Sequence, residues 1–291
     1  MTSTTLASSR RVLEIRRDFA PKWPVVALLV ALLAAPIAAR AAPLDLSLHS
    51  FYDPNQAPAQ RTQNGSYKVL MSELAFVLGP RVSGPAQSLG SLGMEAAYEL
   101  SFAQTNAKAD YWRDSVAKPE PWVSTGQLHV RKGLPYAMQI GGTLTHLFDS
   151  NMWVMGMDLN LSLIDGFVNV PDVAVRAVLQ TMVGNQDISM LMVGADFVIS
   201  KSFGIAGLMS LQPWASYSFL FSQVTTKQIE VYSDQVTLEP DLMLLNRVDN
   251  YSHRAAFGLR VVVTRISIGG EYLRSFSDGL SMFTAKIGAD F

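Results

Sequence analysis

The stretch "MWVMGMDLNLSL", residues 152–163, alternates between large apolar side chains and mostly small or polar ones. Its odd-numbered positions are all apolar: Trp153, Met155, Met157, Leu159, Leu161 and Leu163. A period of two residues is typical of a strand with one apolar and one polar face. The stretch has about 12 residues, whereas strands of soluble domains have about 5 or 6. It therefore predicts a strand of the length that crosses a bilayer at a tilt, about 9 to 11 residues.

The same alternation recurs along the chain, separated by turn signals such as "NG" at residues 64–65. Strands are predicted at 44–51, 66–78, 92–104, 122–131, 136–148, 152–163, 173–183, 188–199, 205–223, 253–263, 266–276 and 279–291. The predicted fold class is therefore all-β, a transmembrane antiparallel up-and-down β-barrel of about 12 strands. An even strand count would place both termini of the barrel on the periplasmic side of the membrane.

The N-terminus has the pattern of a secretory signal peptide. Basic residues from Arg10 to Lys22 precede the apolar run "PVVALLVALLAAPIAA", which begins at Pro24, and Ala39–Ala41 supplies small residues for cleavage. The run of about 15 residues is shorter than the roughly 20 that a membrane-spanning helix needs. We expect residues 1–41 to be the signal peptide and residues 42–291 to be the barrel; an uncleaved N-terminal anchor is the alternative.

The chain ends in "SMFTAKIGADF", residues 281–291, with a terminal phenylalanine. The apolar residues at alternate positions are Phe283, Ala285, Ile287, Ala289 and Phe291. This end resembles the C-terminal insertion signal of bacterial outer-membrane β-barrel proteins. The resemblance implies transit through the periplasm, insertion by the barrel-assembly machinery, and a location in the outer membrane with its lipid as a partner.

A secreted β-sandwich or lipocalin-like barrel is the soluble alternative. Such a protein would bury its apolar face and expose its charges. The strand lengths and the terminal phenylalanine argue against it, as does a charged fraction of 16%, because soluble domains usually carry about 25%. The net charge of −1 gives no indication of nucleic-acid binding.

If the apolar strand face meets lipid, the opposite face lines the barrel lumen. The candidate lumen residues are Glu95, Glu99, His129, Asp158, Arg176, Asp196, Arg254, Arg260, Glu271, Lys286 and Asp290. Barrels of about eight strands are filled by side chains, and those of sixteen or more leave a channel. A barrel of about twelve strands leaves two interpretations open: a narrow pore for small hydrophilic solutes, and a lumen closed by paired acids and bases.

The segment 224–252 is the candidate gate or partner-binding loop. Its stretch "EPDLMLLNRV" places Pro240 at a position suited to the first turn of a helix. Leu242, Leu245 and Val248 recur at helical spacing, which suggests a short amphipathic helix. The alternative is a strand extension with an ordinary loop.

Signals for catalysis are poor in this sequence, and an enzyme is the third hypothesis. The chain has no cysteine, no G-x-S-x-G nucleophile motif, and no metal-ligand spacing among His49, His129, His146 and His253. We expect no enzyme activity, no cofactor and no metal. The predicted function is a porin-like channel. The alternative is a non-conducting structural or docking barrel with partners in an envelope-spanning complex for secretion, adhesion or gliding motility.

Overall fold

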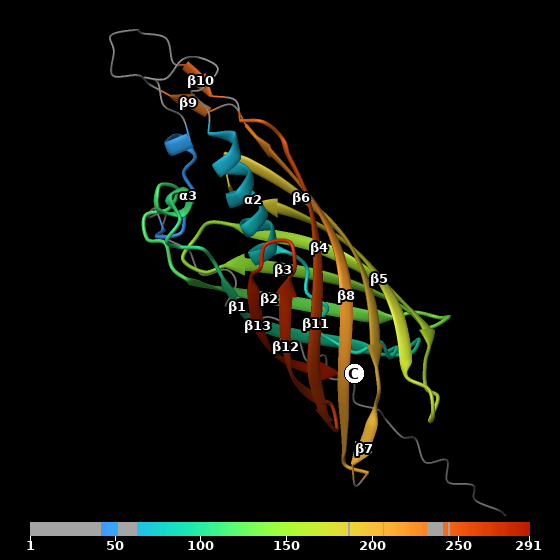
Figure 1. Ribbon diagram of the computed structural model, residues 1–291. Coiled ribbons are helices and arrows are strands. Elements are labelled where there is room, and N and C mark those ends of the chain that lie inside the picture. Colours follow the sequence, from blue (N-terminus) through green and yellow to red (C-terminus); the bar gives the residue numbers. More distant parts are fainter. Residues whose placement is uncertain are drawn as a thin grey trace, which may run out of the picture. The chain divides into compact units, whose positions relative to one another are not determined.

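The computed structural model is a closed antiparallel β-barrel and describes residues 42–51, 63–185, 187–205, 207–227, 229–231, 241–243 and 245–291 (Figure 1). Within this described part, ten long strands form the wall. They are β1 (Met94–Gln104), β2 (Trp122–Gly133), β3 (Met138–Leu147), β4 (Trp153–Ile164), β5 (Asp172–Val183), β6 (Ile188–Ser200), β8 (Met209–Thr226), β11 (Val248–Val263), β12 (Ile266–Ser275) and β13 (Ser281–Asp290). Each pairs antiparallel with the next, and β13 pairs with β1 to close the ring.

The prediction of about twelve wall strands is wrong, because two of the predicted strands are not strands. The described residues 44–51 contain only the short 3-10 helix η1 (His49–Phe51), and residues 66–78 lie in the helix α2 (Asn64–Leu78). The other ten predicted strands each correspond to a wall strand. Outside the ring, β7 (Phe203–Ile205) pairs with β8, while β9 (Ile229–Val231) and β10 (Asp241–Met243) form a separate hairpin.

The barrel has two distinguishable ends. At one, which we call the turn end, lie Phe291, the start of β1 and short connections such as the two-residue turn Thr264–Arg265. At the other, the loop end, lie the longer connections 105–121, with the short helix α3 (Asp110–Arg113), and that from β8 to β11. Figure 1 shows the label C and β7 far from α3, β9 and β10.

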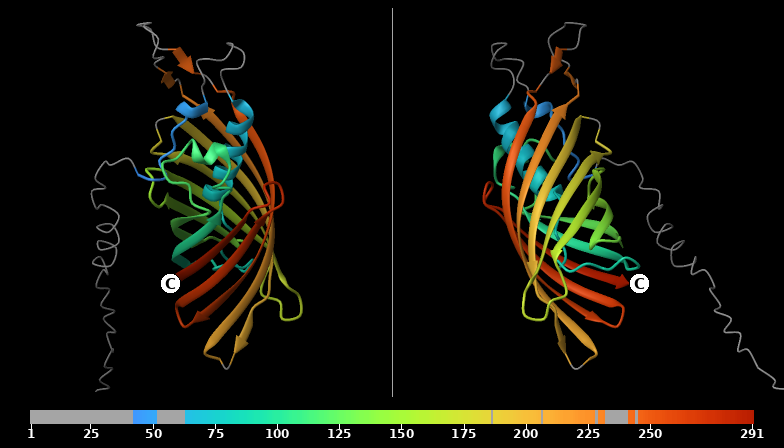
Figure 2. Two further views of the ribbon diagram at one scale, coloured as in Figure 1. Left: turned by 60° about the vertical axis from the view of Figure 1, so that its left-hand side comes forward. Right: turned by 90° about the vertical axis from the view of Figure 1, so that its right-hand side faces the viewer.

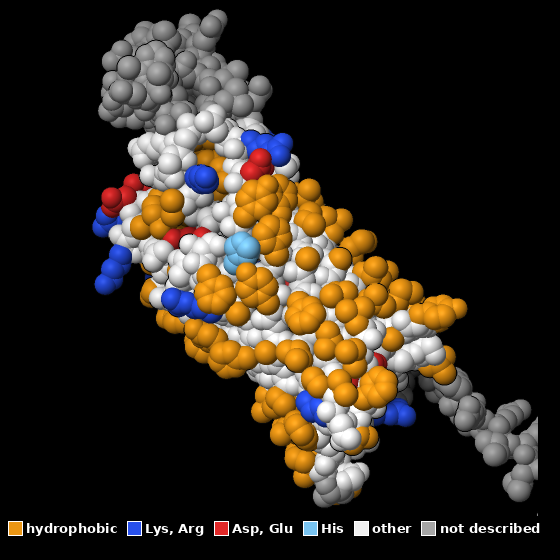
Figure 3. All heavy atoms as spheres, turned by 45° about the vertical axis from the view of Figure 1, so that its right-hand side comes forward, with side chains coloured by type: hydrophobic (Ala, Val, Ile, Leu, Met, Phe, Trp, Pro, Cys, Tyr) orange, Lys and Arg blue, Asp and Glu red, His pale blue; other side chains and the backbone are white. Residues whose placement is uncertain are grey.

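The wall is apolar outside and polar inside. Along β4, the outward Met155, Met157 and Leu159 are exposed, with Met157 at 58%, whereas the inward Asp158 and Asn160 are buried. Figure 3 shows hydrophobic side chains over the visible outer surface of the strands. This arrangement is the reverse of a soluble barrel, which hides apolar side chains and exposes polar ones.

Helix α2 lies inside the ring and contacts wall strands β2, β8 and β11 (Figure 2). The sequence folds as a helix here because its apolar residues recur at intervals of three and four: Tyr67, Leu70, Met71, Leu74, Ala75 and Leu78. The helix stops at Gly79, where the backbone becomes extended (φ −63°, ψ 160°), and Pro80 follows. A residue before proline is disfavoured in the helical region, so the stop is encoded locally.

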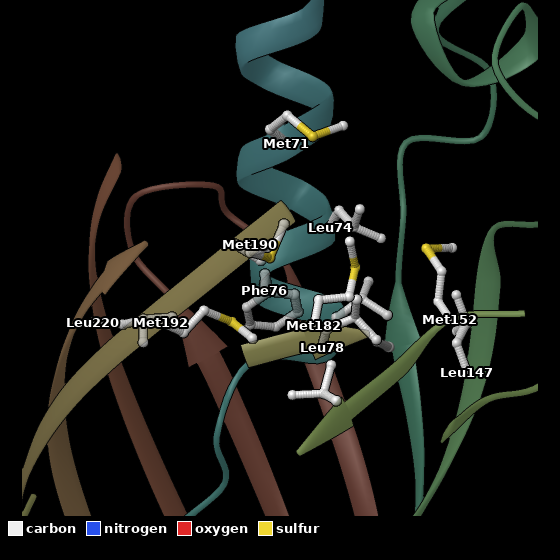
Figure 4. Close-up of a cluster of buried hydrophobic side chains, with 14 of the residues drawn as sticks. Met71, Leu74, Phe76, Leu78, Leu147, Met152, Met182, Met190, Met192 and Leu220 are labelled. Atoms are coloured by element: carbon white, nitrogen blue, oxygen red, sulfur yellow. The ribbon is translucent and has the colours of Figure 1, made fainter. Parts of the chain in front are cut away.

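The lumen around α2 is apolar. Inward-facing Met182, Met190, Met192 and Leu220 from β5, β6 and β8 are all buried with Phe76 in one cluster. Figure 4 shows these side chains beside the helix. We call α2 and this surrounding wall the apolar half of the lumen. Methionine side chains are unbranched and flexible, so they fill the irregular space between a helix and a curved sheet.

Among the described residues, no helix is both long and apolar enough to span a membrane.

Candidate functional site

The lumen nearer the turn end is polar, and it contains the extended segment 79–91 that follows α2. We call this segment and its wall the polar half of the lumen. Every residue from Glu73 to Ala86 is buried. The segment leaves the lumen at the turn end, where the Met94 N–H donates to the Phe291 carbonyl (3.0 Å) as β1 begins. The chain therefore passes through its own barrel before building the wall.

The predicted lumen residues lie at inward-facing positions of the wall. Ten of them are buried: Glu95, Glu99, His129, Asp158, Arg176, Asp196, Arg254, Arg260, Glu271 and Lys286. The eleventh, Asp290, is half-buried at the turn end. The alternation of the strands places all of these side chains on one side of the sheet.

One group of these charges forms an ion-pair network near the turn end. The Glu95 carboxylate pairs with Arg131 and, at 2.6 Å, with the Nζ of Lys286. The Arg260 guanidinium donates to both Asp290 oxygens at 2.7 Å. These pairs connect β1, β2, β11 and β13, so acid and base neutralise each other within the wall.

A second group lies farther along the wall. The His129 ring lies between two carboxylates, with Nε2 2.8 Å from Asp158 Oδ1 and Nδ1 3.5 Å from Glu99 Oε1. Arg176 Nη2 lies 2.7 Å from Asp196 Oδ2. Buried charges require partners because transfer out of water is costly, and the network supplies them from other wall strands.

Arg254 differs from the other wall cations. It is fully buried in the interior, and its Nε and Nη1 have no hydrogen-bond partner within the described part of the chain. A Cβ atom at Gly79 would lie 3.0 Å from its Nη1. Gly79 therefore lets the lumen segment pass close to this guanidinium.

Arg81 attaches the lumen segment to the wall. Its side chain is only 1% exposed. Nη1 donates to Gln127 Oε1 at 3.0 Å, and Nη2 donates to the Thr125 hydroxyl. Both acceptors are on β2, so Arg81 holds the end of α2 against this strand.

The wall also binds the main chain of the segment. The Ser83 N–H donates to Glu271 (2.7 Å) and its carbonyl accepts from Lys286 Nζ (2.8 Å). The Ala86 N–H donates to the Ser200 hydroxyl (3.0 Å) and its carbonyl accepts from Ser162 (2.7 Å). Further contacts join Gln139 to the Gln87 carbonyl and the Ser88 N–H to Asp165.

The space left beside this segment is small. A cavity lined by Ser83, Trp214, Arg260, Glu271 and Lys286 has a volume of about 10 Å³. That is about the space of one water molecule. The part of the lumen occupied by residues 79–91 therefore has no room for a solute at this point.

Glu73 connects α2 to the connection 105–121 at the loop end. Its carboxylate, 2% exposed, accepts hydrogen bonds from the Asn106 N–H, the Tyr111 hydroxyl and the Trp112 indole N–H. Burial, and then the hydrogen bond to Glu73, raise the pKa of Tyr111 above its ordinary value. The helix and this loop are therefore held to each other by one buried acid.

Sequence reasoning missed Glu73, Arg81 and Ser83 because residues 66–78 were interpreted as a wall strand. The spacing of apolar residues by three and four in that stretch, followed by "GP" at residues 79–80, is the signal that identifies the helix and its end. No pattern in residues 79–91 predicts that this segment lies within the lumen.

The candidate gate loop differs from the suggested helix. Pro240 lies outside the described residues, and Leu242 belongs to the strand β10. Leu245 and Val248 are buried at the loop end. Strand β8 continues to Thr226, and strand β11 begins at Val248. The described residues therefore agree with strand extensions joined by a loop.

The residues of the C-terminal pattern lie on or directly after β13. Phe283, Ala285, Ile287 and Phe291 are exposed on the outer surface, and Ala289 is half-buried. Over the described residues, no group of three or more His, Asp or Glu side chains is arranged to hold a metal ion.

Comparison with known proteins finds no matching family model and no matching curated sequence. Solved structures that resemble the chain include outer-membrane protein Omp33 of Acinetobacter baumannii, with 10% identity over 70% of this chain and 100% of that one, at a TM-score of 0.31. The KdgM porin has 7% identity over 69% of this chain and 99% of its own, at a TM-score of 0.30. The outer-membrane protease OmpT of Escherichia coli has 9% identity over 68% of this chain and 97% of its own, at a TM-score of 0.31. These neighbours are bacterial outer-membrane β-barrel proteins.

Proposed function

We propose that the protein is an outer-membrane β-barrel that is closed at rest by its own segment 64–91 and serves as a non-conducting scaffold, presenting its loop end to partners in the cell envelope. The observation that carries this proposal is the fixed segment in the lumen. Buried Arg81 and main-chain contacts at Ser83 and Ala86 attach it to several wall strands. An open pore would not need these contacts.

Membrane insertion is supported by the outer surface. A closed ring pairs the backbone groups of every wall strand, which lipid requires because it offers no hydrogen bonds. Outward aromatic rings meet in a row toward the loop end: Phe257 and Tyr272 at 5.2 Å, Tyr272 and Phe283 at 5.0 Å, and Phe283 and Trp122 at 6.0 Å between centroids. Such rings form girdles at membrane interfaces.

The orientation follows from the lengths of the connections. Outer-membrane barrels have short turns on the periplasmic side and longer loops outside. The loop end, with the connections 105–121 and β8 to β11, is therefore assigned to the cell exterior. The turn end, with Phe291, faces the periplasm.

A gated channel for small hydrophilic solutes is the second candidate function. It is favoured by the ion pairs of the wall, because Glu95–Lys286, Arg260–Asp290 and Arg176–Asp196 join wall residues to each other. These pairs would persist if the segment 79–91 left the lumen. The channel would then require displacement of that segment, whereas the scaffold requires that it stay.

Planar-bilayer recordings of the folded protein test the proposal. We expect the unaltered protein to show no stable conductance steps, and a deletion of residues 64–91 to give salt-dependent steps. Because that deletion removes much of the apolar half and endangers folding, the double variant Arg81→Ala with Ser83→Ala is the second test. It removes the guanidinium contacts with β2 and the hydrogen bond that the Ser83 hydroxyl donates to Glu99 (2.7 Å). It should give intermittent openings, while Arg265→Ala at the exposed turn stays silent.

Stable conductance of the unaltered protein would overturn the scaffold. Openings triggered by voltage or a solute, with the segment still attached to the chain, would favour the gated channel.

A further inference from the structure

The path of the chain through its own lumen has a topological consequence. Residues 42–51 lie at the loop end, where the Leu44 N–H donates to the Asp149 carbonyl (2.8 Å) and the Ser47 N–H to the Ser115 carbonyl (2.8 Å). The Asp45 carboxylate accepts both the N–H and the side-chain amide of Asn151, each at 2.8 Å. We call residues 42–51 the arm.

The arm is continuous with the start of α2 at the same end. The Gln63 N–H donates to the Phe51 carbonyl at 3.0 Å, and the rings of Phe51 and Tyr67 meet edge to face with centroids 5.9 Å apart. From there α2 and segment 79–91 run through the lumen to Met94 at the turn end. The arm and the start of the wall thus lie at opposite ends of the barrel.

Recognition of the extended part does not depend on side chains alone. Residues 83–88 present main-chain N–H and carbonyl groups to side chains of the wall and of the connection after β4. The wall residues are Glu271, Lys286, Ser200, Ser162 and Gln139, and the residue after β4 is Asp165. Main-chain contacts bind an extended polypeptide through groups that almost every residue has. The polar half therefore has the chemistry of a cradle for an extended peptide.

We propose that the polar half of the lumen is a polypeptide-binding cradle that holds the chain across the outer membrane, so that the arm, residues 42–51, is displayed on the cell surface. This inference rests on the proposed outer-membrane location and orientation. It goes beyond the scaffold function because it assigns the arm and the periplasmic Phe291 to opposite sides of the membrane. The natural ligand of the lumen is then an extended peptide, supplied by the protein itself.

Single-cysteine labelling tests this topology directly, since the chain contains no cysteine. Ser50→Cys reports the arm, Ala117→Cys the loop end and Val168→Cys the turn end, and all three positions are exposed. The probe is a maleimide–polyethylene glycol reagent too large to cross the outer membrane. Intact cells and lysed cells are labelled in parallel, after fractionation has located each variant.

The expected result is labelling of Ser50→Cys and Ala117→Cys on intact cells, and of Val168→Cys only after lysis. Labelling of Ala117→Cys but not Ser50→Cys on intact cells would overturn the display of the arm while leaving the scaffold in place. Labelling of Val168→Cys alone on intact cells would show that the barrel has the opposite orientation. That result would also overturn the display of the arm. Recovery of all variants outside the outer-membrane fraction would instead refute the proposed location.

The cradle itself is tested with Ser162→Ala and Ser200→Ala combined, which removes both partners of the Ala86 main chain. We expect protease added outside lipid vesicles to cut near residues 79–91 at least tenfold faster than in the unaltered protein. The matched control is Ser277→Ala, an exposed serine in the turn between β12 and β13. Equal cutting of the variant and the unaltered protein would mean that these contacts do not hold the peptide.

Discussion

The two halves of the lumen hold one continuous segment in different ways. In the apolar half, α2 satisfies its own backbone and packs side chains such as Phe76 and Leu74 against methionines of the wall. In the polar half, segment 79–91 pairs with no strand of the described residues, and wall side chains donate to or accept from its main chain. A helix therefore needs an apolar wall, and an extended segment needs a polar one.

The switch between these two modes occurs at Gly79 and Pro80, where the helix ends. On the wall, the same strands change character at that level. β13 carries the apolar Met282 toward the loop end and Lys286 toward the turn end, both inward and buried. The sequence of the wall is thus matched to the conformation of the segment that it encloses.

The largest expected effect is a loss of packing in the apolar half. Phe76→Ala removes a ring that is 1% exposed, and such truncations cost about 3–5 kcal/mol because a cavity remains. Urea unfolding of the detergent-folded protein, followed by gel migration, measures the loss. Phe276→Ala, at a ring 61% exposed, should change stability by less than about 0.5 kcal/mol. Similar losses for both variants would contradict a packed apolar half.

A smaller effect is expected from the polar half, where several contacts share the attachment. Arg81→Met preserves length but leaves the Thr125 hydroxyl without its donor, whereas Gln127 Oε1 still accepts from the Thr145 hydroxyl (2.9 Å). An unsatisfied buried group costs about 1–3 kcal/mol. The same unfolding assay should place Arg81→Met between the unaltered protein and Phe76→Ala, with Arg265→Met as the exposed control. A loss as large as that of Phe76→Ala would show that one residue holds the segment.

The wall could be predicted from the sequence, and the lumen contents could not. Period-two alternation identified ten strands because each one separates lipid-like from polar surroundings, and the inward charges followed from the same parity. In residues 66–78, apolar side chains occur at both parities, including Leu70, Met71 and Leu74. That pattern fits a helix buried on nearly all sides and fails as a half-buried strand.

The wall did contain an indirect clue. Met182, Met190 and Met192 occupy inward positions where a water-filled pore would have polar residues. The position of α2 explains these inward methionines, because an apolar helix in the lumen packs against an apolar wall. No residue taken singly shows that the two belong together, since the match is between segments more than a hundred positions apart.

The contact between α2 and the loop end gives the next smaller effect. Glu73→Gln keeps one acceptor oxygen but loses the charge that strengthens bonds from Asn106, Tyr111 and Trp112. We expect a loss of about 1 kcal/mol and faster trypsin cleavage at Lys108 and Arg113. The control is Glu120→Gln, whose exposed pair with Lys118 should contribute almost nothing. An unchanged cleavage rate in Glu73→Gln would mean that Glu73 does not hold the connection 105–121 to α2.

The smallest expected effect lies where the polar half ends. Asp165 accepts the Ser88 N–H at 3.0 Å. Partial burial raises the pKa of Asp165, the Ser88 hydrogen bond opposes the rise, and nearby Asp172 adds to it. The folded protein therefore holds this proton more tightly than the unfolded chain. The protonated carboxyl favours the fold at low pH, and that contribution is lost as the pH rises through its folded pKa.

Asp165→Asn keeps an acceptor for Ser88 and cannot ionise. Its stability should equal that of the unaltered protein near pH 3 and exceed it at pH 7 by less than about 0.5 kcal/mol, since solvent screens a group this exposed. Urea midpoints at the two pH values measure the difference, with Asp114→Asn in the loop-end connection as the control. If the variant is less stable at pH 7, the charge on Asp165 strengthens the hydrogen bond from the Ser88 N–H by more than the desolvation of that charge costs. The turn end would then hold the segment electrostatically, whereas the apolar half holds α2 by side-chain packing and by the hydrogen bonds to Glu73.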